Sequence, residues 1–197
     1  QHFRSIAKQD LHCHAFLSCP YEKLIKILRQ DPLPKKRLQF ESFQDFSKHI
    51  AKYYIPPLSK LEYQRAVIQG MCDAMRKDHV VYAEASFDVM AAVAIRCSWS
   101  ELASELQKLF NTHKTKLLVS PELGLARECL RFPKIQGLVE EALDTGFFEG
   151  IDLYGDEHAY PLSDFKWYFD LASQRKLRIK CHDGEQQGPK EVWQCIE

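Results

Sequence analysis

Short apolar runs and longer amphipathic segments alternate along this chain. The apolar runs have the length and character of strands, and they cover residues 5–14, 79–87, 115–126, 147–155 and 176–184. Each run is followed by a segment whose apolar residues recur at helical spacing. Five repeats of strand and helix predict an α/β protein with a parallel sheet.

Two of the helical segments show the pattern most clearly. In residues 59–78, apolar side chains recur at spacings of mostly three and four on one side, which is the side expected to pack on a sheet. Residues 98–114 repeat this pattern, and Ser98 or Ser100 is the expected N-cap of the helix. Glu101 stands at capping-box distance from Ser98.

The predicted sheet can close in two ways. It can form a doubly wound open sheet, or it can form part of a (β/α)8 barrel. No GxGxxG or GxxxxGK[ST] motif follows the first strand, which weakens a nucleotide-binding open sheet. Residues 31–60, between the first two strands, form a proline-punctuated insertion for which we predict short helices and a lid-like position over a site. We expect residues 1–197 to be a single domain.

Composition and charge exclude several classes of protein. The chain has 197 residues, 45% of them hydrophobic, and equal numbers of basic and acidic residues (27 each). This balance argues against a nucleic-acid binder, and no run of about 20 apolar residues predicts a membrane helix. The seven cysteines lack a CxxC pair, so we expect reduced thiols and a cytoplasmic location. The chain opens on Gln1 and stops at Glu197 within a helical pattern, as expected for part of a longer protein.

Two histidines stand close together at the end of the first predicted strand, in "KQDLHCHAF". Alternate side chains of a strand share a face, so His12 and His14 point the same way while Leu11 and Cys13 point the other. Two imidazoles in this position can both bind a divalent cation when further ligands arrive from elsewhere. On its own the pair is also typical of structural or surface histidines.

The last predicted strand runs directly into "HDGE", residues 182–185. It places an imidazole, His182, and a carboxylate, Glu185, three residues apart, with a glycine between them that permits a tight turn. A loop that caps the helix beginning near Pro189 is the alternative explanation. In a parallel barrel the carboxyl ends of all strands meet at one mouth, which would bring His182 to the histidine pair of the first strand.

The fourth predicted strand ends in "EGIDLYGDE". Gly155 is the kind of residue found where a backbone closely approaches a ligand, although it can also form a simple turn. In this order, the HxH, "GIDLYGDE" and "HDGE" motifs resemble the adenosine deaminase family of metal-dependent hydrolases. "VVYAEASF" is also similar to the second-strand pattern of that family, so the resemblance spans nearly the whole chain.

The resemblance implies a (β/α)8 barrel of the TIM type, of which this chain would hold about the first five strand-helix units. It implies a zinc ion held by three histidines, His12, His14 and His182. Glu185 would be the proton donor to a purine ring nitrogen, and Gly155 would offer its backbone to the bound base. Zinc would lower the pKa of bound water towards 7, so that hydroxide attacks the amino-bearing carbon of a 6-aminopurine and ammonia leaves.

Three departures from the family pattern concern the pocket. Ala15, Phe16 and Leu17 follow the HxH motif where family members that act on adenosine usually have LDG, so we predict a more apolar pocket wall. Phe87 takes the place of an arginine in the second-strand pattern, and Asp183 would add a carboxylate beside the metal. Adenosine and other 6-aminopurines therefore both remain open as substrates.

The family takes a catalytic-base histidine and a carboxylate metal ligand from strands that follow the "HDGE" motif. This chain contains neither an HGxR nor an SxxDDP sequence. Five strands of an eight-stranded barrel would also leave two open sheet edges. We therefore expect the remaining strands to come from a C-terminal continuation or from another chain.

The resemblance thus implies a zinc-dependent hydrolytic deaminase of purine metabolism that acts on a small purine nucleoside or base. A non-catalytic relative that binds a nucleoside or a protein partner without turnover is the alternative. A third possibility is an unrelated α/β domain, in which the three histidines do not converge.

Overall fold

The computed structural model describes residues 5–28 and 39–196, which form two compact units. Unit 1 comprises Gln1–Ala85 and Met90–Val119, and unit 2 comprises Ser86–Val89 and Ser120–Glu197.

Among the described residues the sheet has five strands, and their order in the sheet is also their order in the chain. They are β1 (Lys8–His14), β2 (Val80–Asp88), β3 (Leu118–Ala126), β4 (Gly150–Tyr154) and β5 (Arg178–Cys181). All five predicted strands are therefore confirmed. Most are shorter than the predicted ranges, because those ranges included polar and turn residues that flank each strand.

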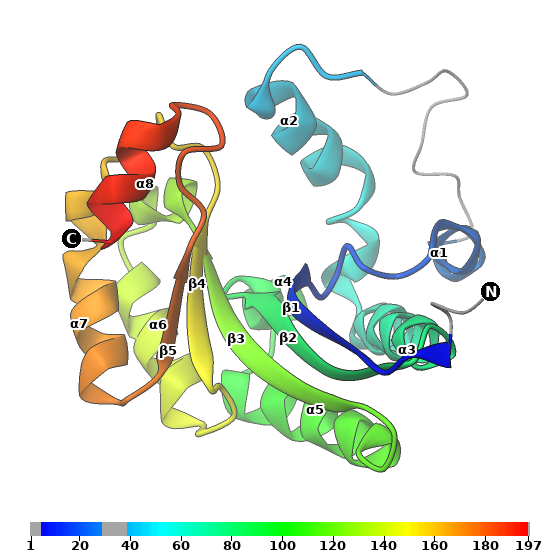
Figure 1. Cartoon of the computed structure of the whole chain (residues 1–197). Helices are drawn as coiled ribbons and strands as arrows, with labels where there is room; N and C mark the ends of the chain where they lie inside the picture. Colours follow the sequence, from blue (N-terminus) through cyan, green and yellow to red (C-terminus); the bar gives the residue numbers. More distant parts are fainter. Residues whose placement is uncertain (1–4, 29–38, 197) are drawn as a thin grey trace. The chain divides into compact units, whose positions relative to one another are not determined.

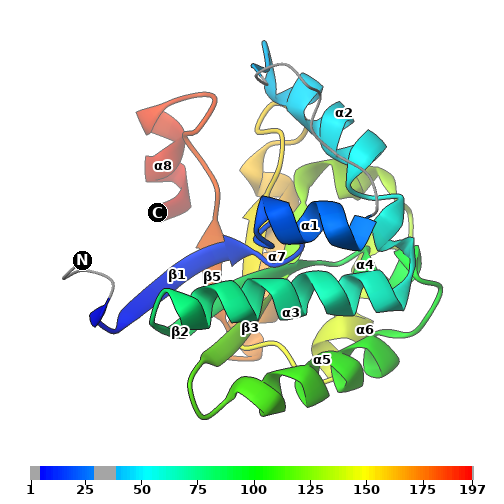
Figure 2. The ribbon, with the colours of Figure 1, turned by 90° about the vertical axis from the view of Figure 1, so that its right-hand side faces the viewer.

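Unit 1 contains β1, the first part of β2 and most of the helices that precede β3. The backbone N–H of Lys8 donates to the carbonyl oxygen of His79 (2.9 Å), which places the starts of β1 and β2 side by side. The helices of unit 1 are α1 (Tyr21–Leu28), α2 (Phe43–Tyr53), η2 (Pro57–Ser59), α3 (Leu61–Lys77), α4 (Ala91–Ala94) and α5 (Trp99–His113). Helix α1 lies along α3 in Figures 1 and 2, and buried Cys19, Leu24 and Val67 belong to the apolar cluster there.

The two long helices of unit 1 follow the sequence pattern closely. Helix α3 buries the apolar side predicted for it, including Val67, Ile68 and Met71. Helix α5 is capped by Ser98, whose hydroxyl accepts from the Glu101 N–H (3.2 Å) while the Ser98 N–H donates to the Glu101 carboxylate (2.9 Å). Of the two predicted N-caps, Ser98 rather than Ser100 is therefore the one that caps the helix. None of the helices in the described ranges is long and apolar enough to cross a membrane.

The predicted insertion is described only in part. Residues 31–38 lie outside the described residues, and residues 39–60 carry α2 and η2. Helix α2 has no buried residue, although an N-cap hydrogen bond from the Asp45 N–H to Ser42 Oγ (3.1 Å) supports its start. The lid-like role of the insertion and the single-domain organisation stay predictions.

Unit 2 contains the last residues of β2, most of β3, and β4 and β5. Strands β3, β4 and β5 pair in parallel, with Leu125 opposite Leu153 and Leu153 opposite Cys181. The carboxyl ends of these strands therefore lie side by side. The helices of unit 2 are η3 (Arg127–Arg131), α6 (Ile135–Asp144), η4 (Leu162–Phe165), α7 (Lys166–Gln174), which packs on β5, and α8 (Pro189–Ile196). Its fully buried side chains include Leu123, Ile151, Leu153, Phe165 and Tyr168.

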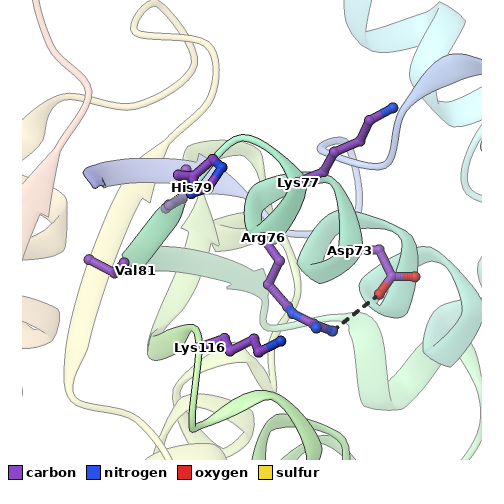
Figure 3. A pocket seen from close by; sticks show the side chains of 7 residues that line it. Asp73, Arg76, Lys77, His79, Val81 and Lys116 are labelled. Atoms are coloured by element: carbon purple, nitrogen blue, oxygen red, sulfur yellow. Dashed lines mark ion pairs between the residues drawn. The ribbon is translucent and has the colours of Figure 1, made fainter. Parts of the chain in front are cut away.

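A cavity of about 660 Å³ opens in unit 1 at the start of β2 (Figure 3). Most of its lining is charged or basic, and includes Asp73, Arg76, Lys77, His79 and Lys116. Arg76 forms an ion pair with Asp73 inside it (3.9 Å). The cavity lies at the amino ends of the strands, so it is separate from the carboxyl end of β1, where His14 lies.

A buried histidine borders this charged group. His113 at the end of α5 is 4% exposed, and Arg76 Nη1 donates to its Nδ1 (3.2 Å). The other ring nitrogen, Nε2, lies 2.9 Å from Nε2 of Gln69. Burial, followed by the charge of Arg76, lowers the pKa of His113 below its ordinary value of 6.5, while Asp73 opposes this shift. The folded structure therefore disfavours the protonated form of His113.

This arrangement predicts how the free energy of unfolding depends on pH. Below pH 6.5 the unfolded chain protonates His113 more readily than the folded chain does, so stability decreases as the pH falls from 6.5 towards the lower folded pKa. Urea unfolding at pH 7.5 and pH 5.5 measures this loss, and it should be smaller in His113→Gln, which cannot take up a proton. An equal loss in both proteins would show that His113 does not contribute.

Candidate metal and substrate site

The histidine pair of β1 has the geometry that the sequence predicts. His12 and His14 lie on one face of the strand, with ring centroids 5.0 Å apart and the rings edge to face. The end of β1 is fixed by the carbonyl oxygen of His14, which accepts from the Leu17 N–H (3.0 Å) and from the Ser18 hydroxyl (2.8 Å). Unit 1 therefore presents two neighbouring imidazoles at the carboxyl end of its first strand.

His182 lies immediately after β5, in unit 2. Its backbone N–H donates to the carbonyl oxygen of Leu153 (2.7 Å), so the residue still continues the sheet pairing. On its ring, Nε2 is 3.4 Å from Oδ1 of Asp152 and Nδ1 is 3.3 Å from Oε1 of Glu185. The hydrogen bond with Asp152 is the main reason that the pKa of His182 is raised above 6.5, and the charges of Asp152 and Glu185 add to it. Two carboxylates thus hold both nitrogens of this imidazole.

Asp152 is a residue of this site that the sequence reasoning missed. It lies in the middle of β4 and is fully buried. A charged residue inside an otherwise apolar strand, in "GIDLY", was the available signal, because a carboxylate is rarely buried without a partner.

Glu185 is placed by its backbone and by His182 rather than by burial. Its side chain is 59% exposed. Its N–H donates to Oε1 of Glu157 (2.8 Å), and Glu157 itself is only 3% exposed. The turn before it needs Gly184, which has a φ of +81°. The loop after β5 is therefore tied to the loop after β4.

Gly155, the predicted contact to a base, lies in that second loop. Its φ is +110°, and a Cβ at this position would come within 3.0 Å of the Arg127 backbone nitrogen, so only glycine fits. The carbonyl oxygen of Gly155 accepts from Nε2 of Gln186, next to Glu185 (3.3 Å). The structure thus links the Gly155 and Glu185 segments within unit 2. Whether Gly155 binds a base stays a prediction.

Comparison with known proteins assigns the chain to a family. The model of the family described as adenosine deaminase matches residues 29–197. This chain belongs to the adenosine deaminase family. A Treponema pallidum protein that carries the provisional name adenosine/adenine deaminase is 25% identical to it, with an alignment that covers 100% of this chain and 65% of that protein.

Solved structures related to this adenosine deaminase family member share its fold. An amidohydrolase from Burkholderia ambifaria with bound Zn has a TM-score of 0.77 at 15% identity, and the match covers 99% of this chain and 57% of that one. The N6-methyl-AMP deaminase of Arabidopsis thaliana has a TM-score of 0.73 at 19% identity, with 98% and 62% covered. The prediction of the first strand-helix units of a (β/α)8 barrel is confirmed. The chain spans 57% to 65% of the length of these proteins.

One residue of this adenosine deaminase family member has a different position from the one expected. Asp183, in the "HDGE" motif, was expected to add a carboxylate beside a metal. Its side chain is only 4% exposed, and its Oδ2 lies 3.1 Å from Nη2 of Arg127. The two residues are 56 positions apart in the sequence, so no local sequence pattern predicts their ion pair. The carboxylate of Asp183 is therefore already neutralised by a guanidinium.

Proposed function

We propose that this protein is a zinc-dependent hydrolytic deaminase that acts on adenosine or a related 6-aminopurine and releases ammonia. The observation that carries the proposal is the set of histidine side chains at the carboxyl ends of β1 and β5. An imidazole pair ends β1, and an imidazole held between two carboxylates follows β5. This chemistry and the comparisons support an enzyme over the non-catalytic alternative.

The proposed metal ligands are His12, His14 and His182. Three imidazole nitrogens form a donor set that zinc takes in catalytic sites, with a further position left for water, so the residues present fit the ion. Asp152 lies against the nitrogen of His182 and can orient the ring. Zinc, when bound, would activate water for attack on the amino-bearing carbon of the purine.

The remaining roles belong to the loops after β4 and β5. Glu185 would donate a proton to a ring nitrogen of the purine, which makes the adjacent carbon more electrophilic. Its contact with Nδ1 of His182 (3.3 Å) keeps it near the proposed metal ligand, although its side chain is exposed. Gly155 would contact the base through its backbone, which no side chain of its own obstructs.

The substrate class is proposed from this chemistry together with the names of the relatives. Those names include adenosine, adenine and N6-methyl-AMP, and all three contain a purine with a nitrogen substituent at the carbon that is attacked. Ala15 and Phe16, which follow the histidine pair, are both buried, and neither supplies a polar group for a ribose. A catalytic base and a further carboxylate ligand are proposed to come from strands beyond those of this chain.

Ammonia release from the purified, zinc-loaded protein, prepared together with the strands that supply the catalytic base and the further carboxylate ligand, tests this function. Adenosine, adenine, AMP and N6-methyl-AMP are the substrates to compare, with methylamine as the product for the last. We expect turnover of at least one of them and about one zinc per chain by metal analysis. Absence of turnover on all four by a folded, zinc-loaded protein would contradict the proposal.

A further inference from the structure

Arg127 is the most deeply buried cation that unit 2 presents among the described residues. It begins η3, directly after β3, and is 2% exposed. Its Nη2 forms an ion pair with Oδ2 of Asp183 (3.1 Å) and donates to the carbonyl oxygen of His182 (3.3 Å). Its Nη1 donates to the carbonyl oxygen of Tyr160 (3.2 Å), and the guanidinium faces the ring of Phe165, 6.0 Å from its centroid.

Because Arg127 is buried, its charge and its N–H groups need partners within the protein. A buried guanidinium must be paired and hydrogen-bonded, since an uncompensated buried charge is strongly unfavourable. Asp183 supplies the opposite charge, and two carbonyl oxygens accept further hydrogen bonds. Through them, Arg127 holds the backbone of His182 and the side chain of the next residue at the same time. The orientation in which the chain leaves β5 is therefore set by one side chain.

The other end of this loop is held by a second buried group. The carboxylate of Glu157 accepts from three successive backbone N–H groups, those of Glu185 (2.8 Å), Gln186 (3.3 Å) and Gln187 (3.0 Å). Residues 182–187 are thus fixed by Arg127 at the start and by Glu157 at the end. His182 and Glu185 both lie within this segment.

We propose that Arg127 is a positioning residue of the candidate site, which acts with Asp183 to set the orientation of His182 and Glu185. This inference rests on the proposed deaminase function for its effect on turnover. Arg127 touches neither substrate nor metal in this role. It acts through the His182 carbonyl oxygen and through Asp183.

A lysine cannot replace Arg127 in this arrangement. The planar guanidinium presents several N–H groups in a rigid geometry, whereas a lysine ammonium is a compact charge on a flexible chain. Arg127→Lys therefore keeps the charge but loses part of the fixed geometry. In Arg127→Met/Asp183→Leu the whole ion pair is replaced by apolar side chains, so no buried charge is left unpaired and the fold is expected to persist.

The test compares these two variants with the wild-type protein and with Arg131→Lys, a matched control at the exposed end of η3. Three quantities are measured: kcat and KM, the dissociation constant for zinc, and hydrogen exchange of the amides in residues 182–187. We expect kcat/KM to fall about 10- to 100-fold in both Arg127 variants, mainly through kcat. Exchange in residues 182–187 should become faster, while Arg131→Lys behaves as the wild type.

The outcomes separate this inference from the proposed function. Unchanged exchange in residues 182–187 of both Arg127 variants overturns the positioning role. A fall in kcat that only follows the fraction of folded protein, with normal exchange in the folded state, also overturns it. If the wild-type protein shows no turnover but the variants loosen this segment, the deaminase function fails and the positioning role stands.

Discussion

Replacing His182 with alanine is expected to reduce kcat/KM by roughly 10³-fold or more and to lower the zinc content of the purified protein. A bound metal ion contributes several kcal/mol of transition-state stabilisation, and about 1.4 kcal/mol corresponds to a tenfold change in rate. The measurements are ammonia release and zinc per chain. His79→Asn is a suitable control, because His79 lies at the opposite end of the strands of unit 1 and has a positive φ that asparagine tolerates.

His12→Ala provides a second test of the proposed zinc site, at a ligand from β1 instead of the one that follows β5. His182→Ala also removes the partner of buried Asp152, so part of its effect could arise from lost stability. His12→Ala leaves the ion pair between His182 and Asp152 in place and should still cause a comparable loss of activity and zinc. If both residues bind one ion, the double variant should be little worse than either single variant, since ligands of one ion act as a unit. Additive losses would contradict a shared zinc site.

The sequence predicted the strands and the local pairs well because both depend on short-range periodicity. The alternation within β1 places His12 and His14 on one face, and Ser98 caps α5 through a residue three positions away. Each of these features is determined by side chains two or three positions apart in the sequence. They can therefore be predicted without knowledge of the tertiary fold.

The missed features are all contacts between distant parts of the chain. Asp152 contacts the ring of His182 across the paired strands β4 and β5. Arg127 forms an ion pair with Asp183, 56 residues further along the chain. Asp183 illustrates the difficulty, since the motif alone places it beside the histidine and so near a metal. Its side chain is instead buried in an ion pair with the guanidinium of Arg127. Only the tertiary structure reveals that partner.

Glu185→Gln is expected to lower kcat about 10²- to 10⁴-fold, the usual range for removal of a general acid, while zinc content stays close to that of the wild type. Glutamine has nearly the same shape but cannot supply the proton at a comparable rate. The loop should keep its position, because Glu157 holds residue 185 through the backbone N–H, which the substitution leaves in place. Steady-state kinetics with metal analysis and hydrogen exchange of residues 182–187 separate these effects. Glu191→Gln in α8 is the matched control, with a carboxylate outside the proposed chemistry.

Two results would count against a proton-donor role for Glu185. If zinc is lost together with activity, the contact between Glu185 and Nδ1 of His182 is needed mainly to hold the metal ligand in place. If kcat changes less than about threefold with zinc retained, another group donates the proton, since a general acid contributes far more than this. A selective loss of kcat, with normal zinc content and an unchanged loop, is the result that only direct participation in proton transfer explains.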